Sequence, residues 1–284
     1  MNKIYLTTRL YNLDDKLRTC KLEKYLEENF DVSIYMPYRD SDEENISAEN
    51  WKEDIFAMDI KAIDECDTLI GYLDGPEFDE GIGFEIGYAI TKQKSIHIIN
   101  SDFISYSIDD NATKIIDPIL NDFKINIITT ENETINNNNF CDSLSELSQK
   151  LLEKITFSKI TAFAEVKKKP FKYDYFIERG NSKIFNFLTK NQNGSNRLKT
   201  FDSTDDLDKL LASKKVYILA NGTEMHFGSA IIAGICYGLE IPFYIVDDRM
   251  NYLVGHNEIT MKTNLMIDVA SSGYVDIVEF LDAL

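Results

Sequence analysis

The chain has few of the residues that build metal centres and disulfide frameworks. Its 284 residues include only four cysteines and three histidines. Cys20, Cys66, Cys141 and Cys236 are scattered, with no CxxC pair and no zinc-ligand spacing. We therefore expect reduced thiols, as in a cytoplasmic protein, and no bound metal.

Positive charge is also scarce. Lysine and arginine number 30 against 48 aspartates and glutamates, which gives a net charge of −18. Nonspecific binding of nucleic acid needs a basic surface, so small molecules are the expected partners. The sequence has no apolar run of about 18 residues that could span a membrane, and its first residues, MNKIYLTTRLYN, have no signal-peptide core.

Strand-like and helix-like runs alternate along the chain, which is the pattern of a parallel α/β sheet. In the first half, strands are expected at residues 3–7, 32–36, 68–73, 95–99 and 125–129, with helices at 13–28, 50–65, 83–91 and 143–155. This order predicts a flavodoxin-like open sheet of five strands.

A lysine-rich stretch at residues 166–170 precedes a second α/β region. Its strands are expected at 173–177, 197–201, 215–220, 242–246 and 264–269. The length also favours about two domains. We predict domains at 1–160 and 171–284, each a Rossmann-like, parallel five-stranded sheet flanked by helices.

Three carboxylates surround the third expected strand. Asp59 precedes it, Asp79 lies in the acidic turn after it, and Glu85 lies in the first turns of the next helix. Ligands of open α/β sheets bind at the carboxyl ends of the strands, where these acids can meet. A carboxylate pair can supply nucleophilic and acid chemistry at a sugar carbon, and the helix dipole favours an ionised Glu85.

Other interpretations of this segment remain open. An acid-rich turn is also typical of a solvated loop or a calcium site. The glycines at 81, 83 and 87 invite a dinucleotide interpretation, but their spacing is GxGxxxG rather than GxGxxG. Glu85 would also repel a pyrophosphate at this helix N-terminus.

The same residues resemble the nucleoside 2-deoxyribosyltransferase family, which includes relatives that hydrolyse deoxynucleoside monophosphates. The matching segments are Leu73-Asp74-Gly75, Asp79, Gly81 and Glu85-Ile86-Gly87-Tyr88-Ala89. The resemblance extends to Ile4-Tyr5-Leu6, similar to the family's first strand, and to Met36-Pro37-Tyr38-Arg39-Asp40, similar to its second strand and following loop.

This resemblance implies roles for the acids. Glu85 would be the nucleophile that forms a covalent deoxyribosyl intermediate, and Asp79 would protonate the leaving base. Asp59 would help to hold the base. Tyr5 would orient Glu85, although it is equally a candidate for a strand tyrosine with its hydroxyl at the surface. The substrate-binding positions implied are Thr7, Arg9, Tyr38, Arg39, Asp74 and Gly75.

Two positions depart from the family pattern. Thr7-Thr8-Arg9 replaces a turn that often contains glycine or alanine. Arg9 beside hydroxyls can clamp a phosphate, as in the monophosphate-hydrolysing relatives, or it is a surface residue. Tyr38 replaces the common glutamine; it can stack on a base but cannot form paired amide hydrogen bonds, so the family's base preference does not carry over.

A weaker copy of the motif lies 147 residues later. VYILANGTEMHFGSAIIAGICYG aligns without a gap on LIGYLDGPEFDEGIGFEIGYAIT. The glycines at 81 and 87 persist, but Asp79 becomes His226 and Glu85 becomes Ile232. The segment at 263–267 resembles the family's Asn-Leu-Met segment, whose asparagine reaches the sugar in the neighbouring subunit. The resemblance therefore implies an internal pseudo-dimer with one working site, at Glu85, completed by Asn264.

The leading functional hypothesis is transfer of deoxyribose from a deoxynucleoside to another free base, without a cofactor. The first alternative is hydrolysis of the N-glycosidic bond of a (deoxy)nucleoside 5′-monophosphate or related nucleotide. The second is a noncatalytic nucleotide-binding module. Further assembly of the pseudo-dimer into a homo-oligomer is compatible with all three.

Overall fold

The computed structural model describes most of the predicted elements. The described residues are 1–9, 12–41, 50–74, 79–101, 123, 125–129, 149–150, 152–153, 155, 165–178, 204–220, 225, 227–247, 253–254, 260–261, 264–276 and 280. The chain divides into two compact units. Unit 1 comprises Met1–Trp51, Ala57–Phe78 and Gln93–Phe163, and unit 2 comprises Lys52–Phe56, Asp79–Lys92 and Ala164–Leu284.

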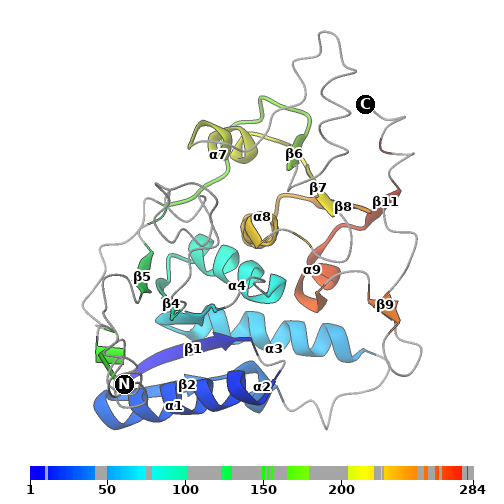
Figure 1. Ribbon diagram of the computed structural model, residues 1–284. Helices are drawn as coiled ribbons and strands as arrows, with labels where there is room; N and C mark the ends of the chain where they lie inside the picture. Colours follow the sequence, from blue (N-terminus) through cyan, green and yellow to red (C-terminus); the bar gives the residue numbers. More distant parts are fainter. Residues whose placement is uncertain are drawn as a thin grey trace, which may run out of the picture. The chain divides into compact units, whose positions relative to one another are not determined.

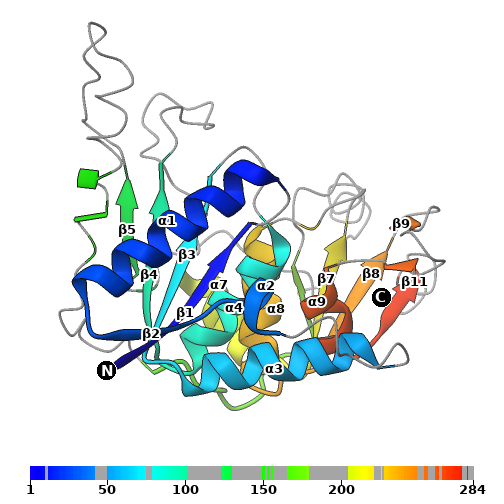
Figure 2. The same cartoon turned by 90° about the horizontal axis from the view of Figure 1, so that it is seen from below.

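Unit 1 is built on a five-stranded sheet in which every pairing is parallel. The strands run side by side in the order β2-β1-β3-β4-β5 (Figure 2). They are β1 (Asn2–Thr8), β2 (Val32–Tyr35), β3 (Thr68–Tyr72), β4 (Ser95–Asn100) and β5 (Asn126–Thr129). This is the flavodoxin-like order, so the prediction for the first half is confirmed.

Helix α1 (Leu13–Asn29) covers one face of this sheet (Figure 2). Asn12 starts it by accepting a hydrogen bond from the Asp15 amide at 2.9 Å, as favoured N-cap residues do. Leu22 and Leu26, four residues apart, lie on one side of the helix and pack into the core. The sheet contributes Ile4, Leu6, Ile70, Ile99 and Ile128 to this core.

Two more helices follow β2. The short α2 (Pro37–Asp40) has proline in its first turn, where the missing N–H costs no helical hydrogen bond. Helix α3 (Trp51–Glu65) leads to β3 and ends at Cys66, as the predicted helix at 50–65 anticipated. The helix predicted at 143–155 lies mostly outside the described residues.

Unit 2 contains a four-stranded sheet, in the order β11-β8-β7-β6, with every pairing parallel. Figure 1 labels its elements. The strands are β6 (Phe176–Glu178), β7 (Val216–Ala220), β8 (Phe243–Asp247) and β11 (Tyr274–Asp276). The other elements are α4 (Glu80–Thr91), α7 (Thr204–Leu211), α8 (Phe227–Gly238), α9 (Leu265–Ala270) and the antiparallel pair β9 (Leu253–Val254) and β10 (Thr260–Met261).

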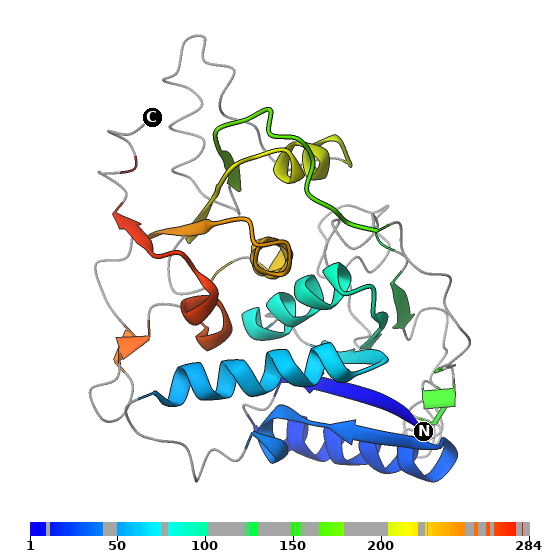
Figure 3. The ribbon, with the colours of Figure 1, turned by 180° about the vertical axis from the view of Figure 1, so that it is seen from behind.

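Helices α4 and α8 pack directly on each other, and α9 contacts both (Figures 1 and 3). A Cβ atom at Gly87 would overlap the carbonyl oxygen of Ile231, and one at Gly234 would overlap the carbonyl oxygen of Phe84. Under the 147-residue offset, Gly87 corresponds to Gly234 and Phe84 to Ile231, so the contact is reciprocal. Glycine is required at both positions because the two backbones touch there.

The offset extends beyond this helix pair. β3, α4, β4 and β5 are followed 147 or 148 residues later by β7, α8, β8 and β11. The ladder register agrees: Ile70 pairs with His97 in the first sheet, and Tyr217 pairs with Tyr244 in the second. The second sheet thus repeats the strand neighbours of the first over this region.

One strand prediction is wrong. Residues 264–269 were expected to form a strand, but Leu265–Ala270 is helix α9. The Asn264 side chain accepts a hydrogen bond from the Met266 amide at 2.9 Å, which starts a helix. A short apolar run cannot distinguish strand from helix by periodicity. The edge position in the sheet is taken by β11, and the strand expected at 197–201 lies outside the described residues.

Candidate functional site

The predicted site residues fall into two groups, one in each unit. In unit 2, Asp79 is the N-cap of α4, and its Oδ1 accepts a hydrogen bond from the Gly81 amide at 2.7 Å. Asn264 is the N-cap of α9, and its Nδ2 donates to the same Asp79 Oδ1 at 3.4 Å. The structure therefore brings together two residues that are 185 positions apart in the sequence.

Glu85 lies inside α4, six residues after Asp79, and is only 5% exposed. Ionised carboxylates are rarely buried, because leaving water costs more than apolar packing returns. At the corresponding position of α8 stands Ile232, which is 1% exposed. Isoleucine fills the corresponding position of α8, so packing alone does not account for the glutamate in α4.

Glu80, the first residue of α4, connects this region to two other segments. One carboxylate oxygen accepts a hydrogen bond from the Met225 amide. The other accepts from the Asn264 amide at 3.2 Å. Helix α9 has a second anchor in Asp268, which pairs with Lys52 at 2.8 Å.

In unit 1, Tyr5 and Asp59 are linked through Tyr35. The Tyr5 and Tyr35 rings stack with centroids 5.5 Å apart. The Tyr35 hydroxyl donates to Asp59 Oδ1 at 3.0 Å. Asp59 is 3% exposed and Tyr5 is fully buried, so the Tyr5 hydroxyl does not lie at the surface. Thr7, two residues further along β1, is also buried.

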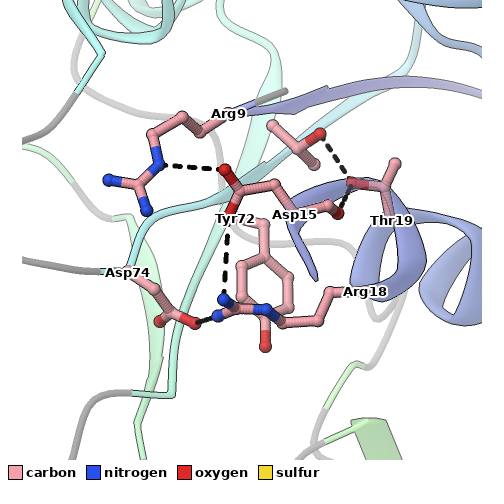
Figure 4. A pocket seen from close by; sticks show the side chains of 7 residues that line it. Arg9, Asp15, Arg18, Thr19, Tyr72 and Asp74 are labelled. Atoms are coloured by element: carbon pink, nitrogen blue, oxygen red, sulfur yellow. Dashed lines mark hydrogen bonds and ion pairs between the residues drawn. The ribbon is translucent and has the colours of Figure 1, made fainter. Parts of the chain in front are cut away.

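A small polar pocket opens in unit 1 where β1 and β3 end (Figure 4). The side chains that line it are Thr8, Arg9, Asp15, Arg18, Thr19, Tyr72 and Asp74. This is the carboxyl edge of the parallel sheet, where ligands of such folds bind.

Ion pairs hold the two arginines of this pocket. Arg9 Nε donates to Asp15 Oδ2 at 3.3 Å, and Arg18 donates to Asp74 Oδ2 at 2.6 Å (Figure 4). Burial by itself lowers the pKa of the Arg18 guanidinium, but the neighbouring Asp74, Tyr72 and Asp15 outweigh it and raise the pKa. Burial, and then the charge of Asp74, raise the pKa of Tyr72. Arg18 is therefore a permanent cation in this pocket.

Asp74, predicted to bind substrate, forms hydrogen bonds with several groups of the protein itself. Besides Arg18, it accepts hydrogen bonds from the backbone amide of Ser101, at 2.6 Å, and from its hydroxyl. The carboxylate thus ties the ends of β3 and β4 to α1 and fixes the position of Arg18. Gly75, the next predicted residue, lies outside the described residues.

The two predicted residues of α2 differ in exposure and partners. Tyr38 is 52% exposed, and its hydroxyl accepts from Lys16 Nζ at 2.9 Å. Arg39 donates to the Ile34 carbonyl at 2.7 Å and pairs with Glu23 and Asp40. Burial raises the pKa of Asp40, but the hydrogen bonds from Arg39 and the Met36 amide outweigh it and lower the pKa overall. Arg39 therefore cross-links α2 to α1 and β2.

Within the described part of the chain, no cluster of three histidine, cysteine or acidic side chains is arranged to hold a metal ion. The helices described there include none with the length and apolar character needed to cross a bilayer.

Three residues with prominent positions were missed from the sequence: Tyr35, Arg18 and Glu80. Arg18 lies three residues after Asp15 on one helix face, and the two side chains form an ion pair at 3.6 Å. Their spacing in the sequence is a weak indication of this pair. Tyr35 ends a strand beside Tyr5, which only the strand register reveals. Glu80 bonds to segments that are 145 and 184 residues away, and no local pattern indicates such contacts.

Comparison with known proteins gives one family match. The model of the family described as nucleoside 2-deoxyribosyltransferase matches residues 4–138. The matched region contains Tyr5, Asp59, Asp79 and Glu85, but not Asn264. No curated protein matches the chain.

Proposed function

Residues 4–138 belong to the nucleoside 2-deoxyribosyltransferase family, and from this premise we propose that the chain moves deoxyribose between bases. It would cleave the N-glycosidic bond of a 2′-deoxynucleoside and pass the sugar to a second base. The observation that carries the proposal is the start of α4, where Asn264 contacts Asp79 and the buried Glu85 follows in the same helix.

In the proposed reaction, a Glu85 oxygen attacks C1′ of the deoxyribose. The C1′–N bond breaks, its electron pair goes to the base, and Asp79 donates a proton to that base. The intermediate is an ester between Glu85 and the sugar. A second base then attacks C1′ and returns its proton to Asp79, and the Glu85 carboxylate is released. A carboxylate suits this role because the transition state is cationic at the sugar.

The remaining roles follow from the family resemblance. Asp59, held by the Tyr35 hydroxyl, would bind the base, and Tyr5 would orient Glu85. Asn264 would contact the sugar. Its contact with Asp79 supports this role, because the asparagine lies beside the proposed acid.

We further propose that the two halves, 1–160 and 171–284, form an internal pseudo-dimer with one working site. The reciprocal contact of Gly87 and Gly234 supports this arrangement. In a twofold dimer, residue i of one copy meets residue j of the other and the reverse, and α4 and α8 meet in this way. The repeated strand order in the second sheet gives further support.

Hydrolysis of a nucleoside 5′-monophosphate is the second candidate, and the pocket of Figure 4 favours it. Arg9 and Arg18 line this pocket together with the hydroxyls of Thr8 and Thr19. Guanidinium groups bind phosphate oxygens in a bidentate manner, and hydroxyls add donors. A 5′-phosphate there would have to compete with Asp15 for the guanidinium of Arg9 and with Asp74 for that of Arg18.

The test is incubation of a 2′-deoxynucleoside with a different free base, followed by chromatography. A new nucleoside is the expected product, and Glu85→Gln should reduce its formation by about a thousandfold or more. Release of free sugar and base without exchange would support the hydrolase instead. A requirement for the 5′-phosphate that is lost in Arg9→Met would assign the phosphate to the pocket. Turnover within about twofold of the wild-type rate in Glu85→Gln would contradict the proposed nucleophile.

A further inference from the structure

We infer that Glu80 is a positioning residue that holds Asn264 against Asp79, an inference that rests on the proposed function of this site. Glu80 is not part of the family resemblance, and the proposed mechanism gives it no role. Its carboxylate accepts hydrogen bonds from the backbone amides of Met225 and Asn264.

These hydrogen bonds are unusual for an acid at the start of a helix. A glutamate in the first turn normally faces the free amides of its own helix or solvent. In α4 the cap is supplied by Asp79, whose side chain accepts from the Gly81 amide. Glu80 is therefore available for two amides from distant segments, and hydrogen bonds to an ionised group are the stronger kind.

The Asn264 amide group is oriented by the contacts around it. Its Oδ1 accepts from the Met266 amide at 2.9 Å, so Nδ2 is the end of the amide that faces Asp79. Glu80 fixes the backbone of the same residue. A residue held at both its backbone and its side chain has little freedom to turn away from Asp79.

Gly81 makes room for this arrangement. A Cβ atom at Gly81 would lie 2.9 Å from Asn264 Nδ2 and 3.0 Å from Asp79 Oδ1. The start of α4 thus makes three contributions. Glu80 binds the Asn264 backbone, Gly81 leaves space for the Asn264 side chain, and Asp79 is the carboxylate that this side chain contacts. In α8 the residue corresponding to Glu80 is Phe227, which cannot accept such hydrogen bonds. Helix α8 therefore has no carboxylate at this position.

Helix α9 has anchors that do not depend on Glu80. Lys52 pairs with Asp268 at 2.8 Å, and the Tyr274 hydroxyl donates to the other oxygen of Asp268 at 2.6 Å. Alanine also has the highest helix propensity, so Glu80→Ala should leave α4 and α9 folded. The expected effect of Glu80→Ala is greater local mobility of Asn264.

The experiment is a double-mutant cycle in the full chain, with base exchange as the rate measurement. Glu80→Ala should reduce kcat by about tenfold with little change in KM, and Glu80→Gln, which keeps one acceptor oxygen, should recover part of the loss. In an Asn264→Ala background, Glu80→Ala should have almost no further effect on kcat, because the side chain that Glu80 positions is gone. The matched control is Glu53→Ala, which removes an exposed acid from the first turn of α3.

A second readout does not depend on turnover. Amide hydrogen exchange, followed by NMR, should be slow at Met225 and Asn264 in the wild type and about tenfold faster in Glu80→Ala. Unchanged exchange at both amides, or equal losses of kcat in the wild-type and Asn264→Ala backgrounds, would overturn the inference. If amide hydrogen exchange is faster in Glu80→Ala but the wild type catalyses no base exchange, the positioning role is upheld and the proposed function is rejected.

Discussion

Helices α4 and α8 have the same length and occupy corresponding places, and they differ most where chemistry would occur. Both are buried along almost their whole length, from Gly81 to Ile90 in one and from Phe227 to Cys236 in the other. Each needs a glycine where the other's backbone passes. Yet α4 begins with an acidic cap and contains Glu85, whereas α8 contains Ile232 in its place.

This difference separates two kinds of constraint on one architecture. Close backbone contact demands glycine in both helices, whatever the reaction. Burial disfavours charged side chains in both, and α8 contains none. Glu85 violates it in α4, and proteins accept such violations chiefly at functional sites. The α8 helix therefore shows what this helix would contain if packing alone decided its sequence.

The largest expected effect comes from exchanging the two central residues. Ile232→Glu places a carboxylate in the apolar surroundings of α8 and should lower the free energy of unfolding by about 3–5 kcal/mol, measured by urea denaturation. Glu85→Ile should leave this free energy unchanged or raise it while abolishing base exchange. Ile232→Met, which keeps the volume, is the control and should cost less than about 1.5 kcal/mol. A well-tolerated Ile232→Glu would mean that both helices can accommodate an acid.

The reciprocal glycines should give a smaller effect that is equal in the two helices. Gly87→Ala and Gly234→Ala each force a methyl group onto a carbonyl oxygen of the other helix, and each should cost about 1–3 kcal/mol of unfolding free energy. At Gly83 an added Cβ would lie 2.9 Å from Ala230 Cβ and 3.1 Å from the Phe227 ring, a smaller overlap than the 2.0 Å at Gly87 and Gly234, so Gly83→Ala should cost less. If Gly87→Ala lowered the free energy of unfolding and Gly234→Ala did not, the contact between the two helices would not be reciprocal.

The smallest effect concerns the two sheets rather than the two helices. His97 in β4 is fully buried between Ser95 and Asn126, and burial lowers the pKa of its imidazole from the usual 6.5. The unfolded chain therefore binds a proton more readily than the folded one, and stability should fall as the pH drops below about 6.5. In β8 the corresponding place is taken by Tyr244 rather than by a histidine.

Urea denaturation of wild type and His97→Gln between pH 5 and pH 7.5 measures this contribution. The wild type should lose more stability than the variant on acidification, because glutamine does not titrate. Parallel pH profiles for the two proteins would show that His97 has no part in the acid sensitivity.

Local sequence patterns predicted much of the fold. Alternating runs located β1 to β5 and helices α1 and α3 to within a few residues, because their apolar periodicity and caps are encoded nearby. The start of α4 was placed three residues late, since Asp79 was assigned to a catalytic loop rather than to a helix cap. Asn264 was singled out by resemblance, but its strand assignment was wrong, because its side chain caps helix α9.

The site was less predictable because its contacts join distant segments. The acids Asp79 and Glu85 stood out by motif, and Asn264 by resemblance. The carboxylate of Glu80, however, binds amides whose position depends on the packing of α9, which no local pattern encodes. Arg18 and Asp74 are likewise 56 residues apart, and they meet only because the first turns of α1 lie at the carboxyl edge of the sheet.

The close contact of α4 with α8 also has a consequence for synthesis on the ribosome. The partner surface of α4 is encoded 147 residues downstream. At about 5–20 residues per second, the apolar face of α4 waits about 7–30 s before α8 has been made. During that interval the nascent chain exposes the kind of surface that chaperones bind. A stop codon between the halves would make this exposure permanent.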